Sequence, residues 1–305
     1  MGARRLRRAS AGLLAATLAI AVVSITAVGS LWLSLAGIRR DPTLLPPDRP
    51  APSSSGAVNL LLIGSDSHQP GGAASVLMLA HVDAAGRNVH LISLPCDLLV
   101  GGSDRLGGLY LQGGSAAVVV AVQQLLGITV DHVALTWLPG MSRLIDLVGG
   151  IPVDNPIAAT TGRFAFPRGA ITLSGEEALA FVRSDVAGAH DLDRAESQRL
   201  VLQGLVSRLL TSNALVNPGV VKAVLDQLAT EVVVDSDLDA RRMVELFFAL
   251  RTRSGARYLQ AIKLPTGTRG ALPTGEAYVA PDQQRVTTLG RAIASDTLPE
   301  WERKR

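Results

Sequence analysis

The sequence predicts an α/β protein, in which short buried strands alternate with helices. Three apolar runs of strand length lie close together, at residues 59–63, 76–82 and 89–94. Further along, apolar segments of similar length alternate with longer segments whose apolar residues recur at helical spacing. Continuously apolar strands belong to sheets that are covered on both faces, and their alternation with helices indicates the α/β class. The 305 residues are enough for one large domain or two smaller ones.

The chain begins with a basic tail and a long uncharged run. Four arginines lie within residues 1–8, and no charged residue occurs from Ala9 to Ile38. This run exceeds the roughly 20 residues that span a bilayer and the apolar core of about 7–15 residues in a signal peptide. Trp32 suits an interfacial position, and the arginine excess before the run favours an amino terminus inside the cell. We expect a cytoplasmic tail at 1–10, a transmembrane helix at 11–37 and an extracellular remainder. A cleaved signal peptide, with a cleavage-like sequence at 27–29, is the alternative.

A segment rich in proline and serine follows the apolar run. Residues 41–56 (DPTLLPPDRPAPSSSG) hold five prolines, three serines and a closing glycine. Such a composition is typical of spacers, so we expect a linker at 41–56 and a domain at 57–305.

The charge balance and the cysteine count exclude two function classes. The formal net charge is +3, but residues 1–40 contain six of the 29 basic residues and no acidic one. The remainder therefore has 23 basic against 26 acidic residues, which argues against a nucleic-acid-binding domain. Cys96 is the only cysteine, so there is no internal disulfide framework or cysteine-rich metal site.

The expected domain alternates strands and helices up to about residue 264. Helices are expected where apolar residues recur at helical spacing, at 115–126, 139–148, 193–210, 220–228 and 240–250. Strands are expected at 133–137, from Ile151 onward and at 258–264. Ser174, followed three residues later by Glu177, predicts a capping box at the start of a further helix.

Two carboxylates follow the ends of predicted strands. Asp66 lies in the turn after the first strand, and Asp97 follows the third strand in the sequence Leu94-Pro95-Cys96-Asp97. Ligands of α/β sheets usually bind at the carboxyl ends of strands, so both residues are candidates for a site. Asp66 could instead cap a turn, and Asp97 could equally form a structural ion pair.

Six landmarks resemble, in order, those of the LytR-CpsA-Psr family of cell-envelope proteins. They are 60–67 (LLLIGSDS), 78–83 (MLAHVD), 93–97 (SLPCD), 149–153 (GGIPV), 175–183 (GEEALAFVR) and 191–198 (DLDRAESQ). The resemblance covers nearly the whole chain. It implies one extracellular α/β domain with a central mixed sheet flanked by helices.

The resemblance also implies a function. Family members are phosphotransferases that move a glycopolymer from a polyprenyl-pyrophosphate carrier onto peptidoglycan, with Mg²⁺ as cofactor. The prenyl chain would need an apolar cavity between the sheet and a helical layer. Carried over to matching positions, the catalytic residues are Asp66, which also holds the metal, Arg183 and Arg194. The substrate-binding residues are Asp97, Arg105 (a lysine in the family), Glu196 and Gln198.

The sequence departs from the family at several polar positions. The family's Arg-Ser-Asp-Thr reads Ala73-Ala74-Ser75-Val76, so the second aspartate is Ser75. Arginines of the family motifs are replaced at 68, 96, 185 and 197 by His, Cys, Asp and Ser. Charge-assisted hydrogen bonds are each typically worth about 1.5–3 kcal/mol, so their loss would weaken transfer. The alternative function is therefore a catalytically degenerate member that binds lipid-linked precursors or regulates envelope assembly.

Two histidines and the low lysine content lead to further expectations about the sheet, the organism and the partners. His81 and His90 alternate with apolar residues, so we interpret both as hydrogen-bonded residues of the sheet. Only three lysines occur beside many Arg, Ala and Gly residues, which is typical of GC-rich genomes. An actinobacterial wall, with arabinogalactan or a teichoic-like polymer as cargo, is the expected setting. The expected partners are the lipid-linked glycopolymer, peptidoglycan and the membrane, without nucleic acid.

Overall fold

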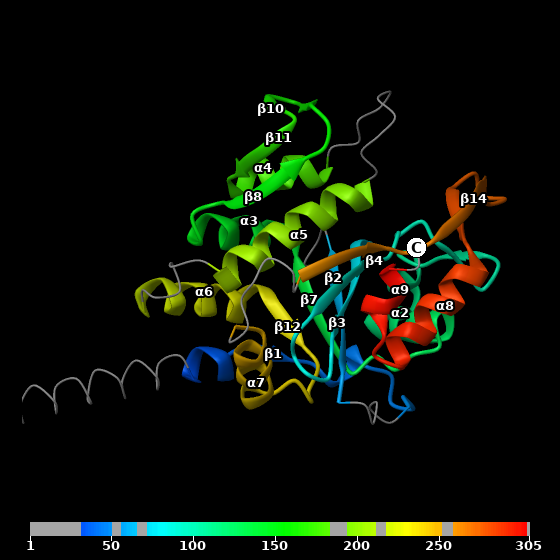
Figure 1. The fold of residues 1–305 in the computed structure, drawn as a ribbon, viewed down its shortest axis with the longest axis horizontal. Helices are drawn as coiled ribbons and strands as arrows, with labels where there is room; N and C mark the ends of the chain where they lie inside the picture. Colours follow the sequence, from blue (N-terminus) through cyan, green and yellow to red (C-terminus); the bar gives the residue numbers. More distant parts are fainter. Residues whose placement is uncertain are drawn as a thin grey trace, which may run out of the picture.

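A seven-stranded mixed sheet runs through the structure, which is a computed structural model describing residues 32–50, 56–65, 72–183, 194–211, 218–251 and 259–303. Figure 1 shows helices on both sides of this sheet. The strands are, in spatial order, β1 (Arg39–Arg40), β12 (Val232–Val234), β7 (His132–Trp137), β2 (Val58–Ser65), β3 (Ala74–Val82), β4 (Val89–Ser93) and β13 (Leu259–Lys263). The α/β class, the mixed sheet and the predicted strands are confirmed.

Strands β2, β3 and β4 form an antiparallel meander. Leu61 of β2 lies opposite Leu79 of β3, which lies opposite Ile92 of β4. A register shift occurs at the Gly64–Ser65 end of β2. Because β2 and β4 both run antiparallel to β3, their carboxyl ends lie at the same edge of the sheet. We call this edge the strand-end edge. It is the place where the sequence predicted the site.

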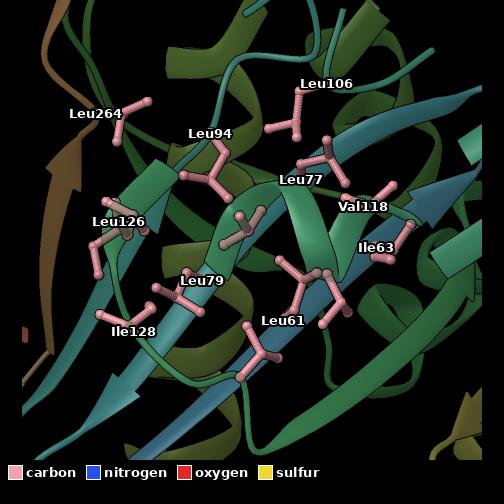
Figure 2. Packing of buried hydrophobic residues seen from close by; sticks show 14 of the residues in the cluster. Leu61, Ile63, Leu77, Leu79, Leu94, Leu106, Val118, Leu126, Ile128 and Leu264 are labelled. Atoms are coloured by element: carbon pink, nitrogen blue, oxygen red, sulfur yellow. The ribbon is translucent and has the colours of Figure 1, made fainter. Parts of the chain in front are cut away.

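The larger core lies between one face of the sheet and a helical layer. This layer contains α2 (Leu109–Leu126), α8 (Gln283–Ala294), α9 (Leu298–Arg303) and the short 3₁₀ helix η1 (Pro42–Leu44). Figure 2 shows Leu61, Leu77 and Leu79 of the sheet near Val118 of α2. All four are at most 1% exposed, so their side chains are removed from water almost completely. Burial of each such side chain contributes roughly 1.5–3 kcal/mol.

Helix α2 begins earlier than the sequence predicted. It starts at Leu109 rather than at 115 and contains non-helical backbone at Gly113 and Gly114, where the helix kinks. By length and composition α2 could cross a membrane, but Val118, Val119 and others of its side chains fill the core against the sheet. The packing of α2 against the sheet therefore accounts in part for its apolar sequence.

A second lobe carries its own smaller core. Its helices are α3 (Leu138–Leu147), α4 (Gly175–Arg183), α5 (Arg194–Thr211) and α6 (Pro218–Glu231). Its strands pair as β8 (Ile151–Asn155) with β11 (Gly169–Leu173) and β9 (Ala159–Thr161) with β10 (Phe164–Phe166). Phe166 packs edge-on against the fully buried Phe181, with ring centroids 5.1 Å apart. The remaining elements described are α7 (Ala240–Arg251) and two hairpins, β5 (Leu99–Val100) with β6 (Asp104–Arg105) and β14 (Thr266–Ala271) with β15 (Ala277–Pro281).

Two of the sequence landmarks have local physical causes. The predicted capping box is present, since the Glu177 carboxylate accepts hydrogen bonds from the backbone N–H and the hydroxyl of Ser174. These hydrogen bonds, that from the backbone first, lower the pKa of Glu177. Gly150 ends the α3 turn with a φ of 83°, and a Cβ there would lie 3.0 Å from the Leu173 carbonyl oxygen. A glycine is needed for both reasons.

Helix α5 approaches the backbone of β8 closely at Gly204. A Cβ at this position would lie only 2.6 Å from the carbonyl oxygen of Pro152. The same helix contacts β4 and β13 of the main sheet. Gly204 therefore lets α5 join the second lobe to the sheet at short distance.

The amino-terminal segment differs from the expected free spacer. Residues 32–36 are helical, β1 adds to the edge of the sheet beside β12, and Leu44 and Leu45 are buried in the main core. Arg49 donates to the Asp131 carbonyl oxygen and pairs with Asp237. The proline-rich segment thus contains a 3₁₀ helix and two buried leucines, directly after the short strand β1. The predicted tail, most of the predicted membrane span and residues 51–55 lie outside the described residues.

A row of polar side chains crosses four strands within the buried sheet. Asn59, His81, His90 and Gln260 lie opposite one another in register on β2, β3, β4 and β13. His81 bonds to Asn59 Oδ1 at 2.8 Å and to Asp296 Oδ1 at 3.1 Å, as the sequence interpretation expected. His90 differs, because neither ring nitrogen has a hydrogen-bond partner within the described residues.

The environment of His90 disfavours its charged form. Its side chain is fully buried, and Glu302 Oε2 lies 3.9 Å from Nε2, beyond hydrogen-bond distance. Burial, and then the neighbouring His81, lower the pKa of His90 from 6.5 to about 4. Burial also lowers the pKa of His81. Both imidazoles are therefore neutral in the folded protein at neutral pH.

This environment predicts a loss of stability in mild acid. Between pH 6.5 and about 4 the unfolded chain binds a proton at His90 that the folded chain does not. As the pH is lowered through this interval, protonation of His90 in the unfolded chain should therefore lower the free energy of unfolding by roughly 1.4 kcal/mol per pH unit. We expect urea unfolding of H90L to show a weaker pH dependence than the native chain across this interval. Equal slopes for both proteins would contradict the assignment.

The contact at Gly204 predicts that even a methyl group is too large there. Alanine normally stabilises a helix relative to glycine by about 1 kcal/mol. In Gly204→Ala, the contact with the Pro152 carbonyl oxygen should reverse the sign, with a loss of about 1–3 kcal/mol in unfolding free energy. Gln203→Ala, on the partly exposed side of α5, is the control and should change stability little. A stabilised G204A would show that α5 can move away from β8 without cost.

Candidate functional site

The strand-end edge is built from the last residues of β2 and the first of β3. Ser65 Oγ donates to the Ala73 carbonyl oxygen at 3.3 Å, and Ser75 Oγ donates to the Gly64 carbonyl oxygen at 3.4 Å. These hydroxyls therefore join the two strands at the irregular end of the pair. Ser75, where the family has an aspartate, is directed at backbone within this edge.

The amino-terminal end of α5 lies against the same edge. Gln198 is buried, and its side-chain Nε2 donates to the Ser75 carbonyl oxygen at 2.6 Å. This bond brings Gln198 beside Ser75, whose hydroxyl bonds to Gly64 of β2, although more than a hundred residues separate Ser75 and Gln198 in the sequence. The Gln198 amide is thus engaged with the protein itself, and its predicted substrate-binding role stays a prediction.

The two residues before Gln198 differ in their surroundings. The Glu196 carboxylate receives two hydrogen bonds from the Arg199 guanidinium, one turn further along α5. Ser197 is fully buried, and its hydroxyl has no hydrogen-bond partner within the described residues. Glu196 therefore forms a local ion pair within α5, and its predicted substrate-binding role stays a prediction.

The segment after β4 carries Cys96 and Asp97. The half-buried Cys96 packs against the main core, and its carbonyl oxygen accepts from the Gly107 N–H at 2.8 Å. Asp97 is exposed, and its carbonyl oxygen accepts from the Val279 N–H of β15 at 3.0 Å. The side chain of Asp97 is thus available to solvent near the strand-end edge.

Arg105 does not point freely toward a substrate. It lies in β6, and its guanidinium forms an ion pair with Glu276, near the turn between β14 and β15. The preceding Asp104 carboxylate accepts hydrogen bonds from Gln112 and Ser103, which lower its pKa. The sequence did not reveal Glu276 as a partner because 171 positions separate it from Arg105.

The three residues predicted to be catalytic are only partly placed. Arg183 is the last residue of α4 and Arg194 is the first residue of α5. Their backbones therefore flank the segment that connects these two helices. Their side chains, and Asp66 as a whole, lie outside the described part of the chain. Their roles remain predictions.

An apolar layer lies where a prenyl cavity was expected, between the sheet and two helices. It comprises Val58, Met78, Ala80, Val82, Val89 and Leu91 of the sheet, with Leu60, Leu62, Leu202, Val206 and Leu246 packed against them. The first group is buried and the second is partly exposed, so apolar surface reaches solvent beside α5 and α7. A separate cavity of about 660 Å³ lies on the other side of the sheet, between α2 and the β5–β6 hairpin.

The described residues do not by themselves fit a magnesium site. Mg²⁺ prefers carboxylate oxygens, usually with phosphate oxygens and water. No group of three His, Cys, Asp or Glu side chains able to hold a metal occurs among them. Ser75 offers a hydroxyl where a second carboxylate was expected, and it is bonded to Gly64. A metal site would thus depend on Asp66.

Comparison with known proteins identifies the family. Residues 41–293 match the model of the LytR_cpsA_psr family. The chain belongs to this family. A relative from Enterococcus faecalis, "Polyisoprenyl-teichoic acid--peptidoglycan teichoic acid transferase TagU", is 29% identical over 77% of this chain and 78% of that protein. The "Cell wall biosynthesis protein LcpA" of Corynebacterium glutamicum is 26% identical over 82% of this chain, but the match covers only 58% of that protein.

Solved structures of the LytR-CpsA-Psr family have the same fold. The crystal structure of B. subtilis TagV superposes with a TM-score of 0.66 at 21% identity, covering 80% of this chain and 98% of that one. The structure described as TagT bound to LIIa-WTA superposes with a TM-score of 0.64 at 20% identity, covering 81% and 96%. The chain is therefore a homologue of cell-wall glycopolymer–peptidoglycan transferases with the family fold.

The adjacent residues Ser197 and Gln198 predict opposite effects of substitution. Ser197→Ala removes a buried hydroxyl without a partner, so stability should be unchanged or increased. Gln198→Met, of similar size, leaves the Ser75 carbonyl oxygen without its donor and should cost about 1–3 kcal/mol. Chemical denaturation of the two variants measures both changes. A destabilised S197A would reveal a partner for the hydroxyl, and an unchanged Q198M would show that the bond contributes nothing.

Proposed function

We propose that the chain is a cell-wall assembly phosphotransferase, which moves a glycopolymer from a polyprenyl-pyrophosphate carrier onto peptidoglycan. Family membership and the transferase relatives support this function. The structural observation that supports it is the bond from Gln198, in a family landmark, to Ser75, which brings the start of α5 to the strand-end edge.

The proposed reaction is a phosphoryl transfer between two oxygen atoms. A peptidoglycan hydroxyl attacks the phosphorus that bears the glycopolymer, a new P–O bond forms, and the hydroxyl proton is released. The P–O bond to the carrier breaks, so polyprenyl phosphate leaves with the bonding electrons. Such reactions depend mainly on positioning and on stabilisation of negative charge. Arg183 and Arg194 would provide that charge, because guanidinium groups match phosphate oxygens geometrically. The prenyl chain would lie in the apolar layer beside α5 and α7.

A second candidate function is favoured by the state of the polar residues. Arg105 is paired with Glu276, Glu196 with Arg199, and Gln198 with the Ser75 backbone. These are retained polar positions, and each already has a partner within the domain. The alternative is thus a degenerate member that binds the lipid-linked precursor, or regulates assembly, without transfer.

The same resemblance supports a proposal for the cellular location and the type of cell wall. We place the domain outside the cell, on a single-pass anchor at the cell membrane, with its amino terminus inside. The similarity to a Corynebacterium glutamicum cell-wall protein agrees with an actinobacterial wall. The cargo would then be arabinogalactan or a teichoic-like polymer.

A turnover assay on the full chain in lipid vesicles tests the proposal. Release of polyprenyl phosphate from polyprenyl-pyrophosphate-linked glycan would be measured with peptidoglycan acceptor, with and without a chelator of divalent cations. Arg183→Ala should lower turnover by roughly 10- to 100-fold, the equivalent of about 1.5–3 kcal/mol for one charged hydrogen bond. Arg163→Ala is the matched control, because this exposed arginine pairs with Glu176 on the second lobe.

A variant with family-like residues separates the two functions. S75D combined with C96R would restore a carboxylate and a guanidinium at positions where the family has them. Turnover by the native chain establishes the transferase. Substrate binding without turnover, together with turnover gained by the double variant, establishes the degenerate member. Neither binding nor turnover by either protein would refute both functions.

A further inference from the structure

The segment that follows the predicted membrane span is docked on the domain rather than hanging from it. In the helix at residues 32–36, Ser34 is buried and its hydroxyl donates to Asp226 Oδ1 of α6 at 2.6 Å. Lys222 Nζ donates to the other carboxylate oxygen of Asp226 at 2.5 Å. These hydrogen bonds, that from Lys222 first, lower the pKa of Asp226. One side of the short helix is therefore fixed to α6.

The end of this helix is also fixed. Ile38 is buried in a cluster with Val234 and Leu238, and the Arg40 guanidinium donates to the carbonyl oxygens of Ala36 and Ile38 at 3.1 and 3.3 Å. A cation that binds the last carbonyl groups of a helix stabilises its end. The chain then continues directly into the sheet as β1. Only Gly37 and Ile38 separate the helix from β1, and the Gly37 N–H bonds back to the Leu33 carbonyl oxygen while Ile38 is buried.

The outer side of the junction is apolar and exposed. Trp32 is 48% exposed and Leu33 is 72% exposed, although both belong to a helix whose other side is docked. The chain that precedes them, residues 9–31, contains no charged residue. These residues lie outside the described structure, and their number matches a bilayer span. Tryptophan at the end of such a run is typical of the membrane–water interface.

The connectivity of the sheet places this junction on the same side as the strand-end edge. β1 pairs in parallel with β12, which runs antiparallel to β7, and β7 is parallel to β2. β1 therefore begins toward the carboxyl end of β2. Helix α6 ends immediately before β12, and α3 begins immediately after β7, so both lie at the same end of these strands. Figure 1 shows α6 and the short blue helix below it at the left, whereas α8 lies at the right.

We propose that the helix at 32–36 and α6 form a surface that lies against the lipid bilayer and holds the strand-end edge at a fixed height above it. The occupant is the bilayer itself, because the uncharged run enters the domain at this surface. The inference adds to the proposed function, since a lipid-linked pyrophosphate lies at the bilayer surface, but it is a statement about orientation that does not require turnover.

The depth of a spin label in proteoliposomes tests this orientation on the full chain. In a Cys96→Ser background, Lys222→Cys places a single nitroxide on α6 and leaves the Ser34–Asp226 bond in place. Thr287→Cys is the control on exposed α8. Nickel chelated to lipid headgroups should enhance the relaxation of the label at 222 and not that at 287. Equal relaxation at both positions would refute the membrane-facing surface.

Two insertions then distinguish a docked junction from a flexible spacer. About ten Gly and Ser residues, with a random-coil reach of roughly 17 Å, are inserted either between Leu33 and Ser34 or after Ser54. The first insertion should abolish the enhancement at 222, because it separates the run from its docked continuation. The second should leave it unchanged. If the insertion after Ser54 abolished it equally, the proline-rich segment would set the height and the proposal would be wrong. Neither result depends on transferase activity.

Discussion

The antiparallel pairing of β2, β3 and β4 is the constraint on which the rest of the domain depends. These strands are apolar on both faces, so each face must be covered by helices, and two separate cores result. The same pairing places the carboxyl ends of β2 and β4 at one edge, with the start of β3 between them. The site is therefore positioned by the requirement to bury the sheet, before any substrate contact is considered.

Helix α5 carries that constraint into the second lobe. At Gly204, where there is no side chain, its backbone packs closely against β8. The same helix contacts β4 and β13, and Gln198 donates a hydrogen bond to the Ser75 carbonyl oxygen of β3. A displacement of α5 at Gly204 would consequently also move the residues at its amino-terminal end. The stability of the second lobe and the geometry of the strand-end edge are coupled through this one helix.

Long periodic segments could be predicted from sequence, and short or distant features could not. Strands β2, β3 and β4 are continuous apolar runs, and the helices from 115 to 250 show an apolar period. Their observed ends differ from the predicted ones by a few residues at most, except at α2. β1 has two residues, and η1 lies among prolines, so neither has a period to detect. Helices α8 and α9, beyond residue 264, were not predicted although Val286 and Leu289 complete the main core.

The candidate site shows the same division. The sequence contains the i, i+3 spacing of Glu196 and Arg199 that allows their helical ion pair, but nothing in it shows that Gln198 bonds to the Ser75 backbone. It could not predict that Glu276 neutralises Arg105, since that pair depends on two hairpins brought together by the tertiary fold. It also expected His90 to be hydrogen-bonded, whereas the partners available on neighbouring strands do not satisfy its ring.

Replacement of the family's arginines affects the stability of the domain as well as the affinity of the strand-end edge for an anion. A cluster of arginines at one edge repels itself until an anion binds, and binding sites commonly lower stability for this reason. Here Ser197 is fully buried, and a guanidinium in its place would have to be removed from water without a described acidic partner. Ser75 and Cys96 are only half-buried, so larger charged side chains there could reach solvent. Positions 75 and 96 can therefore regain charge within this packing, whereas position 197 cannot do so without rearrangement around α5. The domain has the family fold, and the neutral side chain at the buried position 197 needs no opposite charge to balance it.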